Sequence, residues 1–340
     1  VGIEVEPHLR LRQRGKIGGA IDPALAVEAV KRSLEPRRLH PPRRDPAHVV
    51  LAVIAGVGGE EHIGREIVAQ WDRPRKWDCQ REAVEAPAYD PEELYGVLPS
   101  DVKRQFDMRE IIARIVDGSR FHEYQPNYGS TLVCGFANIW GYKVGVLANN
   151  GVLFNDSSLK GGHFIELCNQ NATPLVFLQN ITGYMVGREY ERRGITKDGA
   201  KMIMAQACSR VPKFTVMCNG SFGAGNYGMC GRAFDARLLF AWPNHQIGVM
   251  GGDQAANTLV EVKLNQMKRN GEPVDERTLA EVFERTKSAY QEQLSAYHST
   301  SELWDDGVID PVDTRNALGV AISASLNAPL GDAGYGVFRF

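Results

Sequence analysis

The 340-residue sequence lacks several patterns that would place it in a functional class. No stretch reaches about 18 consecutive apolar residues, so no transmembrane helix is expected. The first residues carry no apolar signal-peptide core. An excess of one charge is also missing, because 39 Lys and Arg stand against 41 Asp and Glu, which argues against a protein held to nucleic acid by phosphate contacts. The sequence therefore predicts no membrane and no nucleic acid among the partners.

Metal and redox motifs are missing as well. No two cysteines have C-x-x-C spacing and no histidine cluster lies beside them, so zinc and redox sites are not expected. Most cysteines lie in apolar runs, where a free thiol behaves as a small hydrophobe, so we expect reduced, buried thiols in a cytosol-like compartment. The sequence also has no P-loop or G-x-S-x-G motif. The six cysteines are Cys79, Cys134, Cys168, Cys208, Cys218 and Cys230.

What is present indicates an ordinary globular protein. Hydrophobic residues make up 43% of the chain and charged residues 24%, which are typical of globular domains. Residues 1–90 form an atypical segment and linker to which no function is assigned; its first 60 residues are basic and broken by proline. From residue 91 to residue 340 the pattern is regular. We expect two regions with this boundary, and the second carries the chemistry.

Strands and helices alternate in the second region. Strands are predicted at 131–139, 142–148, 175–179, 214–218, 238–242 and 247–250. Helices are predicted at 107–116, 157–169, 196–209, 252–268, 278–297 and 313–326. In the first region, helices are predicted at 23–34 and 60–71 and a short strand at 49–57. This alternation predicts an α/β fold with crossover units on a sheet, whose sites lie at the carboxyl ends of strands.

The most informative segment is 211–231, where an apolar strand enters a glycine-rich loop. Glycine lets the backbone approach a ligand closely, and a turn into a helix directs unpaired N–H groups at one point that favours negative charge. Such a turn is one way to build an oxyanion hole. A close-packed crossing of a strand and a helix explains the same glycines equally well.

A second loop, Asn149–Asn150–Gly151, is predicted to follow another strand at the same edge. Two backbone N–H groups from separate loops can stabilise the charge that builds on one carbonyl oxygen. We expect Gly151 to pair in this way with Ala224 and Gly225.

Side chains suited to catalysis are sparse. Ser221 is interpreted as a hydrogen-bonding loop residue, His163 as an ordinary helix-face histidine and His245 as a turn residue without a partner. Asp305 and Asp306 are interpreted as caps and solvated carboxylates rather than metal ligands. Backbone donors with few acids or bases suit a reaction whose substrates carry their own reactive groups.

Several long strings resemble one family, the carboxyltransferase (beta) subunits of biotin-dependent acyl-CoA carboxylases. The methylcrotonoyl-CoA carboxylase branch is the closest, and geranyl-CoA carboxylase is its near neighbour. The resemblance runs from about residue 89 to residue 340, is fainter around 62–77, and covers the family's C-terminal domain. The strings are Q-N-I-T-G-Y-M-V-G-R-E-Y-E at 179–191, G-I-T-K-D-G-A-K-M at 194–202, G-S-F-G-A-G-N-Y-G-M-C-G-R-A-F at 220–234, A-W-P-N at 241–244, V-M-G-G-D-Q-A-A-N at 249–257 and L-W-D-D-G-V-I-D-P-V-D-T-R at 303–315.

The resemblance implies a crotonase-like ββα superhelix and transfer of CO2 from carboxybiotin to an enoyl-CoA such as 3-methylcrotonyl-CoA. It implies that Gly151, Ala224 and Gly225 donate to the ureido carbonyl of biotin, with Asn150 and Gly223 beside them, and that no metal takes part. It also implies a biotin carboxylase and biotin carrier (alpha) subunit, because the chain has no A-M-K-M string of its own.

The family's acyl-CoA site is carried mostly by an N domain, which residues 1–60 do not match. The resemblance therefore implies that the crotonase-like N domain of a partner completes the site. A homo-oligomer within a larger hetero-oligomer is expected, in the cytoplasm of a bacterium or the mitochondrial matrix of a eukaryote.

The departures from the family pattern are small. Asn219 and Arg193 each replace a glycine, Phe222 replaces a tyrosine, and Asp253 replaces a glutamate. Three alternatives stay open. The chain could act on geranyl-CoA or another acyl-CoA, or form a non-catalytic assembly half. It could also be a stand-alone crotonase-type enzyme, such as a hydratase, that uses Glu166 as its acid or base.

Overall fold

The computed structural model describes residues 77–335, apart from 100, 102–103, 272 and 333. The elements predicted at 23–34, 49–57 and 60–71 lie outside the described residues. Of the first predicted region, residues 77–90 are described, and they run along the sheet. Arg81 forms a bridge with Tyr142, and the Glu82 amide donates to the Gly141 carbonyl at 2.8 Å.

The described residues form one eight-stranded sheet in the order β1-β2-β3-β4-β5-β6-β8, with β7 paired to β5. The first three strands are antiparallel neighbours and the others pair in parallel. Trp140 and Gly141 join β2 to β3 with φ values of 52° and 77°, as a two-residue hairpin turn requires. The strands are β1 (His122–Glu123), β2 (Leu132–Ile139), β3 (Tyr142–Asn149), β4 (Leu175–Ile181), β5 (Lys213–Phe222), β6 (Leu238–Ala241), β7 (Gln246–Gly248) and β8 (Gly307–Val308).

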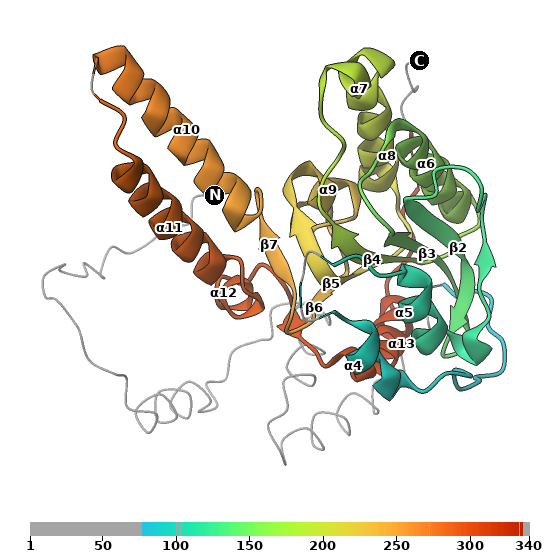
Figure 1. Ribbon diagram of the computed structural model, residues 1–340. Coiled ribbons are helices and arrows are strands. Elements are labelled where there is room, and N and C mark those ends of the chain that lie inside the picture. The colour runs from blue at the N-terminus through green and yellow to red at the C-terminus, as the bar shows by residue number, and fades with distance from the viewer. Residues whose placement is uncertain (1–76, 100, 102–103, 272, 333, 336–340) are drawn as a thin grey trace, which may run out of the picture. The chain divides into compact units, whose positions relative to one another are not determined.

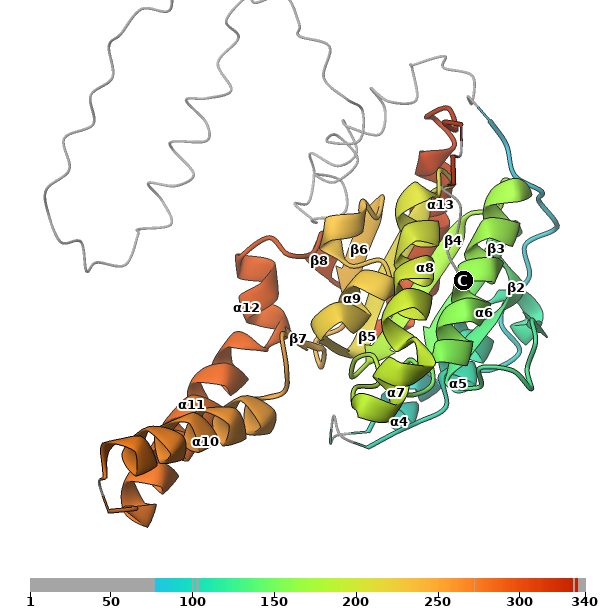
Figure 2. The same cartoon turned by 90° about the horizontal axis from the view of Figure 1, so that it is seen from above.

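Helices cover both faces of the sheet (Figures 1 and 2). One face carries α6 (Asn155–Gln170) and α8 (Ile195–Cys208), and the other carries α5 (Met108–Ile115) and α13 (Thr314–Ser325). The predicted α/β alternation is therefore confirmed. The remaining helices are α4 (Leu94–Val97), α7 (Arg188–Arg193), α9 (Gly223–Gly228), α10 (Gly252–Asn270), α11 (Glu276–Gln293) and α12 (Ala296–Ser301).

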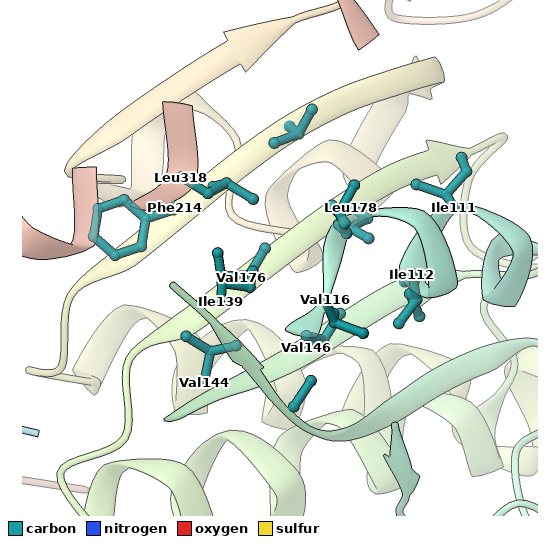
Figure 3. Packing of buried hydrophobic residues seen from close by; sticks show 14 of the residues in the cluster. Ile111, Ile112, Val116, Ile139, Val144, Val146, Val176, Leu178, Phe214 and Leu318 are labelled. Carbon is teal, nitrogen blue, oxygen red and sulfur yellow. The ribbon is translucent and has the colours of Figure 1, made fainter. Parts of the chain in front are cut away.

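Two hydrophobic cores lie on opposite faces of the sheet because side chains alternate along each strand. Val144 and Val146 of β3 pack with Val176, Phe214 and Leu318 in the core beside α5 and α13 (Figure 3). Leu147, which follows Val146 in β3, points to the opposite face and joins the core under α6 and α8. The central strands are buried on both faces, as expected for parallel strands covered by helices.

Helices α10 and α11 form a hairpin that extends away from the sheet (Figures 1 and 2). The prediction of one helix over 278–297 is wrong, because α11 ends at Gln293 and α12 begins at Ala296. The Leu294 carbonyl accepts from Ile247 of β7 at 3.0 Å, and Ser295 is extended and caps α12. Pairing with β7 therefore interrupts the helix. Within the described residues, no helix is both long and apolar enough to cross a bilayer.

Strand β5 is longer than predicted and takes in the first glycine of the loop. Gly220, Ser221 and Phe222 pair with β7, so the chain stays extended as far as Phe222 and turns into α9 at Gly223. The expected strand-to-helix turn is therefore present, and it begins five residues after the predicted strand end.

Candidate functional site

Both candidate loops lie at the carboxyl edge of the parallel strands. β3, β4 and β5 are parallel, so their carboxyl ends at Asn149, Ile181 and Phe222 share one edge of the sheet, where sites in α/β folds form. Gly151 follows the first of these ends and Gly223 follows the third. The end of β4 lies between them.

The amides of Ala224 and Gly225 belong to the first turn of α9. This helix starts at Gly223, directly after β5, and has six residues. The N–H groups of a first helical turn have no acceptor inside the helix, and Phe222 at the N-cap supplies no capping side chain. Ala224 is exposed. The turn therefore offers backbone donors, at the positive end of a helix, beside the sheet edge.

Gly225 packs directly on the segment that follows β4. A Cβ at this position would overlap Ile181 Cγ1 and lie 3.1 Å from Gly183 Cα, so only glycine fits. Gly183 has a φ of 139°, and no atom of the described residues lies within 4 Å of the position its Cβ would take. Sequence reasoning missed Gly183, although it stands in the quoted 179–191 string. The structure places it beside Gly225.

Gly151 and Asn150 form the loop after β3. Gly151 has a φ of 145°, and the atoms nearest to a Cβ there are two carbons of Thr131 at 3.4 Å. Asn150 donates from its amide to the Thr131 carbonyl at 2.8 Å, and its Oδ1 accepts from the Met108 amide at 2.9 Å. The carboxamide oxygen of Asn150 therefore holds the start of α5, whereas Gly151 leaves bare backbone at the edge.

Three buried asparagines connect the ends of the parallel strands. Asn149, Asn180 and Asn219 lie on β3, β4 and β5, respectively, and none is more than 4% exposed. Asn219 Nδ2 donates to Asn180 Oδ1 at 3.0 Å, and the Asn180 amide donates to Asn149 Oδ1 at 3.4 Å. Asn219, which departs from the family pattern, thus holds the Asn180 side chain.

Residues 62–333 match the model of the Carboxyl transferase domain family. This span is well over half of the chain. The chain belongs to the carboxyl transferase family.

Several curated relatives of this carboxyl transferase domain are methylcrotonoyl-CoA carboxylase beta chains. The probable mitochondrial methylcrotonoyl-CoA carboxylase beta chain of Drosophila melanogaster is 54% identical over 257 residues, which are 76% of this chain and 44% of the relative. The mitochondrial methylcrotonoyl-CoA carboxylase beta chain of Arabidopsis thaliana is 55% identical over 283 residues, 82% of this chain and 48% of the relative. The chain spans about half the length of these curated relatives.

Solved structures confirm the crotonase-like fold of the carboxyl transferase domain. The geranyl-CoA carboxylase beta subunit of P. aeruginosa superposes with a TM-score of 0.68 at 43% identity, covering 82% of this chain and 53% of that one. The transcarboxylase 12S subunit, described as a hexamer, gives a TM-score of 0.67 at 29% identity, covering 82% of this chain and 54% of that one. The predicted ββα superhelix is therefore confirmed.

Glu166, the acid or base of the hydratase alternative, lies away from the edge that carries the candidate amides. Glu166 is the twelfth residue of α6, which starts at the sheet edge with Asn155, so it lies about 16 Å along the helix axis from that edge. Burial raises the pKa of Glu166. His245 is 1% exposed, and burial lowers its pKa to about 4, which leaves it neutral at pH 7. The placement of Glu166 argues against the hydratase alternative.

Other side chains singled out in the sequence have structural partners. Ser221 is hydrogen-bonded, as predicted, but it lies in β5 rather than in a loop. His163 is exposed, and a hydrogen bond of 2.5 Å joins its Nδ1 to the Tyr124 hydroxyl. Asp305 accepts from the hydroxyls of Ser299 and Thr300. The predicted burial is confirmed for Cys134, Cys168, Cys218 and Cys230, whereas Cys79 and Cys208 are half-buried.

Asp306 forms an ion pair with Arg232. Its carboxylate accepts from Arg232 at 2.9 Å and from the Leu239 amide at 2.8 Å. The two adjacent aspartates therefore point to different partners, and each stabilises the connection between β6 and β8. Within the described residues, no group of three His, Cys, Asp or Glu side chains is placed to hold a metal ion.

Proposed function

We propose that this chain supplies the carboxybiotin half of a carboxyltransferase, which moves CO2 from carboxybiotin to an enoyl-CoA such as 3-methylcrotonyl-CoA. The observation that carries the proposal is the uncapped first turn of α9 at the carboxyl edge of the sheet, in a chain 50–55% identical to methylcrotonoyl-CoA carboxylase beta chains. An enoyl-CoA with a longer acyl chain is the second candidate substrate, because this chain also resembles the solved geranyl-CoA carboxylase beta subunit.

The donors in this proposal are backbone amides. Ala224 and Gly225 donate to the ureido carbonyl of biotin, and Gly151 contributes from the loop after β3, with Asn150 and Gly223 fixing the backbone on either side. When bound, carboxybiotin supplies CO2 and a ring nitrogen that can accept a proton. The protein stabilises negative charge on the ureido oxygen, and removal of one such donor typically costs about 3–4 kcal/mol.

The described residues fit this chemistry because the uncapped first turn of α9 offers backbone donors at the edge. Gly183 leaves open space beside its backbone, and Gly225 lets the first turn of α9 pack against it. Glu166 lies far along α6, and neutral His245 is buried. A reaction that needed a protein acid or base at the edge would lack one among these residues. The amides orient and stabilise, and the proton acceptor comes with the cofactor.

Partners follow from the same proposal. A biotin carboxylase and biotin carrier alpha subunit delivers the cofactor, and the crotonase-like N domain of a partner completes the acyl-CoA site. The relatives are named beta chains, and two of them are named as mitochondrial. The 12S relative is described as a hexamer. We infer a homo-oligomer within a larger hetero-oligomer, in the mitochondrial matrix of a eukaryote or the cytoplasm of a bacterium.

Substitution of Ala224 by proline tests the donor assignment. Proline is tolerated in the first turn of a helix, where it removes an N–H that has no intrahelical acceptor. In the chain assembled with an alpha subunit and an acyl-CoA-binding half, Ala224→Pro should lower kcat for carboxyl transfer about 100-fold or more. Gln254→Pro is the matched control, because Gln254 lies in the first turn of α10 and is exposed.

Two results would count against the proposal. Equal transfer rates for Ala224→Pro and Gln254→Pro would exclude the α9 amide as a donor. Tight assembly with an alpha subunit, without any change in transfer rate when this chain is added, would favour the non-catalytic assembly half.

A further inference from the structure

A chain of three hydrogen-bonding side chains holds α9 to the sheet. Gln179 of β4 donates from Nε2 to the carbonyl oxygen of Met229, the residue that ends α9, at 2.8 Å. Ser221 Oγ donates to Gln179 Oε1 at 2.6 Å. Asn226 Nδ2 donates to Ser221 Oγ at 2.8 Å. The middle and the end of α9 are thereby tied to the ends of β4 and β5.

This network is enclosed and internally paired. Gln179 and Ser221 are 0% exposed, and a Cβ on Gly231 would overlap Asn226 Oδ1. The Ser221 hydroxyl donates one hydrogen bond and accepts another, and Gln179 uses both ends of its carboxamide. A buried polar group left unpaired is costly, so loss of the central hydroxyl weakens the whole chain of bonds.

The network bears on the direction of the first-turn amides. α9 has six residues and no capping side chain at its N-terminus, so bonds within the helix do little to fix it. Asn226 and Met229 are three residues apart and therefore lie on one side of the helix. Holding that side against the sheet sets the rotation of α9 about its axis, and with it the direction of the Ala224 and Gly225 N–H groups.

We propose that Ser221 is a positioning residue for carboxyl transfer, acting through Gln179 and Asn226 on the α9 amides. The inference rests on the proposed function, because it assumes that these amides are the donors. Ser221 itself touches no substrate. Its hydroxyl keeps the donors aligned with the oxygen on which charge develops, and alignment of this kind affects the transition state more than ground-state binding.

The kinetic arm of the test compares two buried serines. In the assembled complex, Ser221→Ala should lower kcat for transfer from free carboxybiotin at least tenfold and change KM for carboxybiotin less than threefold. Asn226→Ala should show the same split, which keeps the test valid if Ser221→Ala folds poorly. Ser299→Ala removes a hydroxyl that is also 0% exposed but contacts Asp305 in the α12 region, and its kcat should stay within twofold of wild type.

The second arm does not depend on transfer. Amide hydrogen exchange over residues 223–229 should be at least tenfold faster in Ser221→Ala than in Ser299→Ala. Equal kcat values or equal exchange rates for the two variants would overturn the positioning role. If the wild-type complex shows no transfer at all, the proposed function fails, and the exchange arm still decides whether Ser221 fixes α9.

Discussion

Single buried amide side chains connect the ends of the strands that carry the candidate site. Asn180 accepts from Asn219 Nδ2 at 3.0 Å, and both residues are at most 4% exposed. A net contribution of about 0.5–1.5 kcal/mol is typical of an intramolecular hydrogen bond, and an unpaired buried partner costs more. At this scale the site edge depends on pairing between neighbouring side chains.

A double-mutant cycle on these two asparagines measures their pairing. Asn180→Ala and Asn219→Ala should each lower the free energy of unfolding by about 1–3 kcal/mol, because each leaves a buried partner unpaired. The double variant should be more stable than the sum of the single effects predicts, by about 0.5–3 kcal/mol. Urea unfolding checks the cycle. Simple additivity would show that the two carboxamides are not coupled.

His245 should make the protein less stable in mild acid. Burial lowers its pKa from 6.5 to about 4, so the unfolded chain binds a proton between these values while the folded chain does not. Stability is therefore full above pH 6.5 and falls as the pH drops towards 4, by about 3 kcal/mol in total. Urea unfolding at pH 7.5 and pH 4.5 measures the loss. His245→Gln should lose about 2.5 kcal/mol less than wild type over that range, and equal losses would contradict this account.

At the scale of secondary structure, pairing with a strand overrides helical periodicity between α11 and α12. Ser295 is extended, forms a bridge with Gln246, and caps α12 through a hydrogen bond from the His298 amide at 3.2 Å. The amphipathic pattern continues through this point, so the sequence alone predicted one helix. The break is set by a contact with β7, which lies almost 50 residues earlier in the chain.

Ser295→Ala should lower the free energy of unfolding by about 0.5–2 kcal/mol, because it removes the side chain that caps α12. Ser295→Asp should restore most of this loss, since aspartate is an equally good N-cap. Ser301→Ala serves as the control, because that exposed hydroxyl only donates back to the His298 carbonyl. Thermal unfolding distinguishes these cases, and equal losses for the two alanine variants would exclude a capping role.

The elements that sequence predicted well are those with a strong local pattern. β2, β3 and α6 were found within about two residues, because β2 and β3 are short apolar runs bounded by turns and an acidic residue marks the first turn of α6. The full length of β5 was not predicted, because Gly220 and Phe222 are extended only through pairing with β7. Gly183 was missed at the site for the same reason. Its place beside Gly225 comes from the packing of β4 on β5.

At the scale of the whole molecule, the chain spans about half the length of the curated relatives it matches. Its described part contains a sheet edge rich in backbone donors, with Ala224 exposed on that edge. Tyr227, Val186 and Val249 are also exposed, at 48%, 77% and 73%. In the proposed function a partner's N domain completes this edge, so activity belongs to the assembly.

Amide chemical shifts measured during a titration with biotin methyl ester test the central claim most directly. In the chain labelled with ¹⁵N at alanine and glycine, the amide protons of Ala224 and Gly225 should move downfield together and saturate with one affinity, because both donate to the ureido oxygen. Gly252, in the first turn of α10, should not move. Shifts confined to residues outside α9 and its neighbouring loops, or none at all, would contradict the account.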